Sequence, residues 1–285
     1  MRDDFCAFIL SNRRANTVLT YRAVRRCGYR GKVFVVIDDE DPTADDYFAK
    51  FGDDVLVFPK SEIEKTFDLA DNFTNQKGSI IHARNACFHL AREQGYRYFI
   101  ELDDDYNGFW TRFDANHYHG SWRIPDLDLV WSEMVEFLET TPAICVAMGQ
   151  GGDYVGGAEG TLMKSIMSKR KAMNTLICDV EKPFTFVGRI NEDVNTYVRA
   201  GIKGELMLSV LNVHVTQRQT QAASGGMTEI YQDGGTYIKS FYTVMMCPSC
   251  VKISDFGSAQ RRIHHLIDWE KAAVKIVSDQ HRKPD

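Results

Sequence analysis

Short apolar runs alternate with segments of helical periodicity along the N-terminal third of the chain, and this alternation constrains the fold most. Strand-length runs occur at residues 6–11, 32–41, 54–60 and 96–105. Between them, residues 12–31 and 78–95 place apolar side chains at helical spacing and end at glycine. Strand, helix, strand is the unit that builds a parallel sheet, so an α/β fold is expected, with a mostly parallel central sheet flanked by helices.

The rest of the chain continues this pattern less regularly. Helical spacing of apolar residues predicts a helix over 125–141 and a terminal amphipathic helix over 260–278. An apolar run predicts a strand over 143–150, and a glycine-rich loop is expected over 151–161. With 285 residues, of which 44% are hydrophobic, the chain can bury one large core. We therefore expect a single domain made of two halves, residues 1–105 and 106–285.

Cysteine usage and the N-terminus bear on the compartment. The seven cysteines are an odd number and most lie in apolar runs, which is typical of reduced thiols in the cytoplasm. "CPSC" at 247–250 has half the spacing of a structural zinc site, without a second pair downstream. The apolar run at the N-terminus is too short for a signal peptide or a membrane span, so a cytoplasmic protein is expected.

Carboxylates follow two of the expected strands directly. Asp38 and Asp39 end one strand, and Asp103, Asp104 and Asp105 end another. Ligands of open parallel sheets bind beyond the carboxyl ends of the strands, and Asp-x-Asp there can hold Mn²⁺ or Mg²⁺ and leave positions open for phosphate oxygens. The alternative interpretation of the acidic run is a solvated turn or a helix cap.

Basic residues near the same strand ends favour a nucleotide diphosphate as ligand. Arg13 and Arg14 follow the first strand, Lys77 precedes the long helix, and Arg84 lies on that helix. Guanidinium groups pair bidentately with phosphates, although each of these residues alone is equally a surface charge. Neither GxxxxGK[ST] nor GxGxxG follows the first strand, which disfavours a kinase or a dehydrogenase.

Four segments together resemble the GT-A fold of nucleotide-sugar glycosyltransferases over roughly residues 5 to 216: "SNRR", "VVIDDED", "ARNACFHLAREQGYRYFIELDDD" and "INEDVNTYVRAG". The resemblance implies a donor half, 1–105, and an acceptor half, 106–285. It implies that a UDP-sugar and a divalent metal bind at the strand ends. Its donor-binding positions are Asp38 at uracil or ribose, Arg84 near the diphosphate, and Arg13, Lys77, Asp103 and Asp104; its metal ligands are Asp103 and Asp105.

The same resemblance assigns catalytic roles. Asp193, with Glu192 beside it, takes the place where inverting members keep the general base that deprotonates the acceptor hydroxyl. His214 takes the place of a histidine that completes the metal shell. The alternatives are an acid pair at a helix N-terminus for "NED" and a packed core histidine for His214. A retaining enzyme with an acid pair at this position also remains open.

The C-terminal segments "GGMTEIYQDGGTYIKSFYTVMMCPSCVKIS" and "RRIHHLIDWEKAAVKI" resemble phage glycosyltransferases that accompany TET-like dioxygenases and modify 5-hydroxymethylcytosine in DNA. This resemblance implies a DNA acceptor in the host cytoplasm, read in the major groove or flipped out. Basic clusters at 168–171 and 261–265 become candidate phosphate contacts, and Trp110, Trp122 and Tyr118 candidate stacking residues. The net charge of −5 fits a DNA partner poorly and predicts weak, salt-sensitive binding.

Two other functions stay open on the sequence. A GT-A enzyme can use a carbohydrate, a lipid carrier or a protein as its acceptor. A nucleotidyltransferase, or a nucleotide-binding module without turnover, can be built on the same sheet, although a nucleotidyltransferase is expected to carry a glycine-rich loop where this chain has "SNRRAN".

Overall fold

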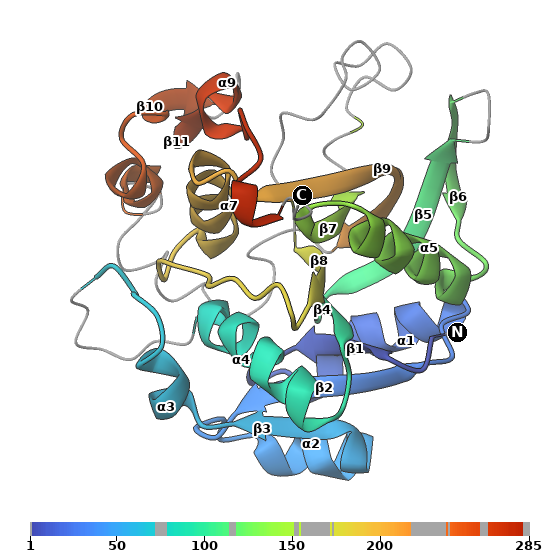
Figure 1. The fold of residues 1–285 in the computed structure, drawn as a ribbon. Coiled ribbons are helices and arrows are strands. Elements are labelled where there is room, and N and C mark those ends of the chain that lie inside the picture. Colours follow the sequence, from blue (N-terminus) through green and yellow to red (C-terminus); the bar gives the residue numbers. More distant parts are fainter. Residues whose placement is uncertain are drawn as a thin grey trace.

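The computed structural model describes residues 2–71, 79–113, 118–150, 154, 172, 174–217, 238, 240–256 and 262–281. In these residues, nine strands form one sheet and two form a separate ribbon. Figure 1 shows their arrangement. The strands are β1 (Phe5–Leu10), β2 (Lys32–Asp38), β3 (Val55–Phe58), β4 (Tyr98–Asp103), β5 (Tyr106–Phe113), β6 (Tyr118–Arg123), β7 (Ala143–Gln150), β8 (Thr175–Asp179), β9 (Leu206–Gln217), β10 (Val251–Phe256) and β11 (Arg262–Ile267).

The described helices alternate with these strands and confirm the expected pattern in the N-terminal third. They are α1 (Leu19–Arg26), α2 (Ala44–Phe51), α3 (Lys60–Glu64), α4 (Ile80–Glu93), α5 (Leu127–Thr140), α7 (Glu192–Ile202) and α9 (Trp269–Ala272), with single 3₁₀ turns at η1 (Ala15–Thr17), η2 (Gly52–Asp54) and η5 (Asp279–His281). Residues 240–246 are also helical. Local sequence explains some boundaries: the Asp126 carboxylate accepts a hydrogen bond from Leu129 N and caps α5.

The order of strands in the sheet creates a topological switch point at β1. The order is β3-β2-β1-β4-β8-β7-β9-β5-β6. The chain leaves β1 for β2 on one side and later places β4 on the other side, with both neighbours parallel to β1. The carboxyl ends of β1 and β4 therefore flank a topological switch point, the usual ligand site of an open α/β sheet.

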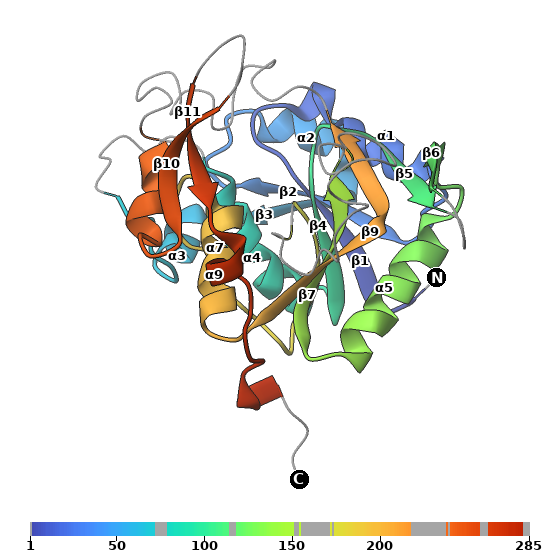
Figure 2. The same cartoon turned by 90° about the horizontal axis from the view of Figure 1, so that it is seen from above.

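Helices cover both faces of the sheet (Figure 2) and pack on it through two apolar cores. One core packs α4 and α7 against alternate side chains of the strands, including Phe8, Phe99 and Cys178. The other packs α1 and α5 against the opposite side chains, with Trp131 at its centre. Because successive strand residues point to opposite faces, a strand covered on both faces is apolar along its whole length, as β1 is.

The expected α/β fold, with a large central sheet flanked by helices, is confirmed. The sheet also contains antiparallel pairs: β8 pairs antiparallel with β4 and β7, and β5 pairs antiparallel with β9 and β6. One expectation is corrected. The amphipathic helix expected over 260–278 is wrong: residues 262–267 form β11, paired antiparallel with β10, and only Trp269–Ala272 is helical. Burial alternates along β11, where His264 and Leu266 are exposed while His265 and Ile267 are buried, as a ribbon lying on a core requires.

Among the described helices, none is both long enough and apolar enough to cross a membrane. All seven cysteines are free and buried. Cys247 and Cys250 lie in the turn that leads into β10, and the described residues contain no group of three or more His, Cys, Asp or Glu side chains arranged for a metal ion.

Candidate active site

The ends of β1 and β4 bring the predicted acidic cluster to the topological switch point. Leu10 pairs with Asp103 in the register of the two strands, so Ser11 and Asp104 are the first residues beyond the sheet. The Ser11 hydroxyl donates a hydrogen bond of 2.6 Å to the Asp104 carboxylate and joins the two strand ends. The three aspartates then take three different environments.

Asp104 lies beneath the site. Its side chain is buried, its carboxylate is 3.3 Å from Arg14 Nε, and its backbone carbonyl accepts hydrogen bonds from Leu19 N and Thr20 N. Burial raises the pKa of Asp104. Asp104, a predicted nucleotide contact, thus links the ends of β1 and β4 to the start of α1.

Asp105 is the aspartate with no hydrogen bond or ion pair to another described side chain, and it is only partly buried. Burial, and then the neighbouring charges of Asp103 and Asp104, raise the pKa of Asp105 to about 6. A raised pKa means that the ionised form lacks compensation in the folded chain. Hard divalent cations bind such carboxylates, so Asp103 and Asp105 fit a Mn²⁺ or Mg²⁺ site.

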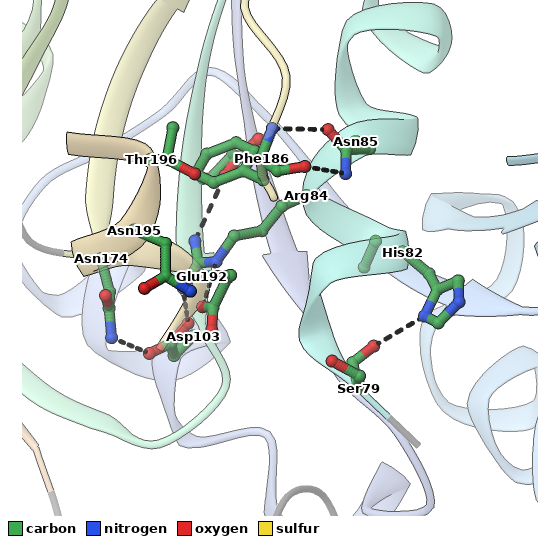
Figure 3. A network of polar contacts seen from close by, with 12 residues as sticks. Ser79, His82, Arg84, Asn85, Asp103, Asn174, Phe186, Glu192, Asn195 and Thr196 are labelled. Atoms are coloured by element: carbon green, nitrogen blue, oxygen red, sulfur yellow. Dashed lines mark hydrogen bonds and ion pairs between the residues drawn. The ribbon is translucent and has the colours of Figure 1, made fainter. Parts of the chain in front are cut away.

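Asp103 is held from two sides (Figure 3). Arg84 Nη2 donates to Asp103 Oδ1 at 3.0 Å, and Asn174 Nδ2 donates to Asp103 Oδ2 at 2.9 Å. A carboxylate has about four acceptor positions, so these two bonds leave capacity for a metal ion. Asp103 is therefore oriented before any ligand arrives.

Arg84 does not reach the surface of the site. Its side chain is 0% exposed and binds three carboxylates: Nε donates to Glu192 at 3.1 Å, Nη1 to Glu101 at 3.2 Å, and Nη2 to Asp103. The guanidinium also lies over the Phe186 ring, 5.7 Å from its centroid. The placement of Arg84 near a diphosphate stays a prediction, and its guanidinium is completely buried among these three carboxylates.

The other predicted donor contacts lie near the carboxyl ends of β1 and β2. Asp38, at the end of β2, is partly buried and accepts a hydrogen bond of 3.0 Å from Asn12 Nδ2. Burial raises the pKa of Asp38. Arg13 is exposed, and its backbone takes the left-handed conformation with φ 56° while its N–H donates to Asp41 at 2.7 Å. Lys77 lies outside the described residues.

The predicted catalytic pair begins α7. Glu192 is buried and accepts from Arg84, and burial followed by the charge of Asp193 raises the pKa of Glu192 to about 7. Asp193 is only partly buried. Since one guanidinium contacts both Asp103 and Glu192, the structure brings the end of β4 and the start of α7 together, as the sequence predicts.

His214 is not brought next to these carboxylates. It lies on β9 opposite Trp110, whereas Tyr106, the residue after Asp105, lies opposite Gln217. Four residues of strand separate the two positions on β5 by about 13 Å. Burial, and then Arg112, lower the pKa of His214 to about 4, and its ring packs on Tyr154 with centroids 4.7 Å apart.

The predicted DNA contacts are scattered over the structure. Trp122 is 63% exposed on the edge strand β6, whereas Trp110 is partly buried and donates from Nε1 to Thr216 Oγ1 at 3.0 Å. His264 and His265 lie on the ribbon, with ring centroids 4.3 Å apart. The cluster at 168–171 and the side chain of Tyr118 lie outside the described residues.

Sequence reasoning missed four residues that hold the site together. Ser11 and Asn174 carried no usable signal, because single polar residues near strands are common. Glu101 was visible as an acid inside the apolar run "YFIELDDD", two residues before Asp103 and so on the same face of the strand. Asn85 stood in the quoted "ARN", but its partner, the backbone of Phe186, is distant in sequence.

The α/β sheet has acidic residues at a switch point, which is where open α/β sheets bind their ligands. The chain belongs to the TET-associated glycosyltransferase family, whose model matches residues 5–226. It is thus a glycosyltransferase, and the family agrees with the GT-A fold expected from the sequence. A search of curated proteins gave no match.

Solved glycosyltransferase structures are similar at low identity. The mannosyltransferase PcManGT from Pyrobaculum calidifontis, in complex with GDP-Man and Mn²⁺, is 12% identical to this chain, with a TM-score of 0.46. The match covers 78% of this chain and 59% of the mannosyltransferase chain. S. aureus TarS 1–349 with UDP-GlcNAc is 12% identical, with a TM-score of 0.43 and coverages of 80% and 64%. Glucosyl-3-phosphoglycerate synthase from Mycobacterium tuberculosis with UDP is 11% identical, with a TM-score of 0.41 and coverages of 90% and 86%. The chain thus spans less than two thirds of the first two proteins, and similarity at this level carries no argument about substrate.

Proposed function

We propose that this chain transfers a sugar from a UDP-sugar to the hydroxymethyl group of 5-hydroxymethylcytosine in DNA. The observation that carries the proposal is the shared guanidinium of Arg84, which binds both Asp103 at the end of β4 and Glu192 at the start of α7. A donor site at the strand ends and a base on α7 are thereby held side by side. The family of TET-associated glycosyltransferases supports the choice of acceptor.

The donor half is proposed to bind UDP beyond β1, β2 and β4. Asp38, which accepts a hydrogen bond from Asn12, is the proposed contact for uracil or ribose, and the exposed Arg13 guanidinium is a proposed contact for the diphosphate. Asp103 and Asp105 would hold Mn²⁺ or Mg²⁺, which offsets the charge of the departing diphosphate when bound. Asp104 and Arg84 act from beneath by fixing these groups. His214 stays a predicted metal ligand that its register does not favour.

Asp193 is proposed as the general base. It is partly exposed, whereas Glu192 beside it is buried against Arg84, so Asp193 is the carboxylate that an acceptor hydroxyl can reach. Removing the hydroxyl proton as the oxygen attacks the anomeric carbon, on the face opposite the diphosphate, gives inversion. Glu192 is then a positioning residue, and its charge favours the ionised Arg84.

The soluble, cytoplasmic setting expected from the free thiols suits a DNA acceptor and is part of the proposal. A carbohydrate acceptor is the alternative. It would use the same donor site and differ only beyond Asp193.

The decisive experiment is the intact mass of a short duplex containing 5-hydroxymethylcytosine after incubation with the protein, Mn²⁺ and a panel of UDP-sugars. A gain of one hexose or one N-acetylhexosamine that Asp105→Ala lacks is expected. Unchanged DNA alongside continued hydrolysis of a UDP-sugar would move the acceptor to another class of molecule. Unmodified duplex DNA serves as the matched control substrate.

A further inference from the structure

Arg84 and Asn85 are adjacent on α4, and each binds a different part of the segment that leads into α7. Arg84 contacts Glu192, the first residue of α7, as well as Asp103 and Glu101 on β4. Asn85 binds the backbone of Phe186 in both directions: its Nδ2 donates to the carbonyl at 3.1 Å and its Oδ1 accepts from the N–H at 2.9 Å. One turn of α4 therefore touches the donor site and the catalytic segment together (Figure 3).

The guanidinium of Arg84 holds three carboxylates at fixed positions relative to one another. It is planar and rigid, and each of its three nitrogen atoms binds a different carboxylate, so the relative positions of Asp103, Glu101 and Glu192 are fixed by one group. The side chain is fully buried. A lysine has a single nitrogen on a flexible stem and cannot reproduce this three-way contact.

The segment from Phe186 to α7 connects the backbone that Asn85 binds to the first turns of α7. Thr196 Oγ1 accepts a hydrogen bond of 3.2 Å from Val187 N, and Asn195 Nδ2 donates to the carbonyl of Ile190 at 2.9 Å. These bonds fold the segment back onto the first turns of α7. Its start is thus tied to α4 at two points, Phe186 and Glu192.

We propose that Arg84 and Asn85 are positioning residues that set the distance and orientation between the metal-binding Asp103 and the base-carrying start of α7. The assignment rests on the roles proposed above for Asp103 and Asp193. Arg84 acts on both partners, whereas Asn85 acts only on the catalytic segment. Substitutions of Arg84 and of Asn85 are therefore expected to have different effects on metal binding and on kcat.

The test compares Arg84→Lys, Asn85→Asp and, as a matched control, Arg97→Lys. Arg97 binds Asp179 beside the other end of β4 and touches neither Asp103 nor α7. For each protein, Mn²⁺ binding in the presence of UDP and UDP binding in EDTA are measured by calorimetry. Turnover is measured as hydrolysis of a UDP-sugar, which needs no acceptor. Circular dichroism and the thermal midpoint report folding.

Arg84→Lys is expected to weaken Mn²⁺ binding and lower kcat by about tenfold or more each, as changes to groups that orient metal ligands do. Its UDP affinity without metal should stay within about twofold, because Arg84 does not touch the phosphates. Asn85→Asp keeps the acceptor for Phe186 N and loses the donor, so kcat should fall about tenfold at unchanged Mn²⁺ affinity. Arg97→Lys should match the wild type.

Two results would overturn the assignment. A tenfold loss of metal-free UDP affinity in Arg84→Lys would make Arg84 a phosphate ligand, and an unchanged kcat in Asn85→Asp would remove the coupling to α7. If Arg84→Lys fails to fold, Asn85→Asp still decides the second point. Failure of the DNA acceptor alone would leave all these measurements intact, and a wild type without Mn²⁺ binding would refute the proposed donor site itself.

Discussion

His214 is buried on β9 as a neutral ring, and this makes it a source of acid sensitivity. Its pKa falls to about 4 in the folded chain, from a usual value of 6.5, so between these values the unfolded state binds more protons than the folded state. Stability therefore decreases as pH falls from about 6.5 to 4, by about 2 kcal/mol from this residue.

The corresponding variant is His214→Phe, which keeps a ring against Tyr154 but cannot titrate. Free energies of unfolding in urea, measured from pH 4.5 to 7.5, should depend less steeply on pH than in the wild type. His89→Phe, which changes an exposed histidine of α4, is the control and should keep the wild-type slope. Equal slopes for His214→Phe and the wild type would contradict the buried neutral state.

Ala70 and Gly188 both have left-handed backbones in the loops beside α7, with φ 56° and 82°. The conformation costs a residue with a Cβ about 1 kcal/mol relative to glycine. Ala70→Gly should thus raise the free energy of unfolding slightly, by up to about 1 kcal/mol, less the entropy that glycine adds to the unfolded chain. Gly188→Ala should lower it by more, since its Cβ would lie 2.6 Å from Asn195 Nδ2. Thermal midpoints check both signs, and a stabilised Gly188→Ala would refute the argument.

The ribbon of β10 and β11 has one face on the core and one face in solvent. Lys252 and His264 are exposed and Leu266 is 48% exposed, whereas Val251, His265 and Ile267 are buried. A two-stranded ribbon fits the major groove of a duplex, and its cations release counterions from the phosphates. Under the proposed function, we therefore predict that this ribbon contacts the DNA acceptor.

Changing Lys252 and His264 to glutamate should weaken duplex binding about tenfold at low salt, and the difference should shrink as salt rises. Fluorescence anisotropy of a labelled duplex at several salt concentrations measures this. Lys65→Glu is the control, since Lys65, which directly follows α3, is also an exposed cation but lies within residues 1–105. UDP binding should stay unchanged in all three proteins. An unaltered DNA affinity in the ribbon variant would place the duplex on another surface.

The same ribbon shows where sequence reasoning about elements succeeds and fails. Residues 80–93 could be assigned to a helix because their apolar residues fit helical spacing alone. Residues 98–103 could be assigned to a strand because they form a short continuous apolar run. In 262–267, Ile263, Leu266 and Ile267 satisfy helical spacing and also alternate in part, so pairing with Val251–Phe256 decides the structure. The same contrast holds for the site. The acidic residues at the strand ends could be predicted from the local sequence, but the partners of Arg84 depend on a contact between α4 and α7, which are distant in sequence.

The folded chain as a whole gathers more carboxyl groups than cations at its proposed donor site. One guanidinium faces Glu101, Asp103 and Glu192, and the pKa of Asp105 rises to about 6 from 3.8. Between pH 4 and 6 the unfolded carboxyl binds fewer protons than the folded one, so this residue lowers stability as pH rises through that range. The site is destabilised until a cation arrives.

Asp105→Asn should therefore raise the free energy of unfolding without metal at pH 7, by on the order of 1 kcal/mol. In the wild type, Mn²⁺ with UDP should raise the thermal midpoint and EDTA should reverse the shift, whereas Asp105→Asn should lack it. Asp54→Asn, which changes a carboxylate already paired with Lys32, is the control and should not gain stability. A less stable Asp105→Asn protein would contradict the uncompensated charge.

The position of β8 has a consequence for how the molecule can be divided. This strand comes from the acceptor half, yet it lies between β4 and β7 and covers the edge that β4 would otherwise expose. A fragment ending at residue 105 would carry an open, apolar strand edge, and such edges promote aggregation. We therefore predict that residues 1–105 and 106–285 fold as one unit, and that a fragment ending at residue 105 aggregates when it is expressed alone.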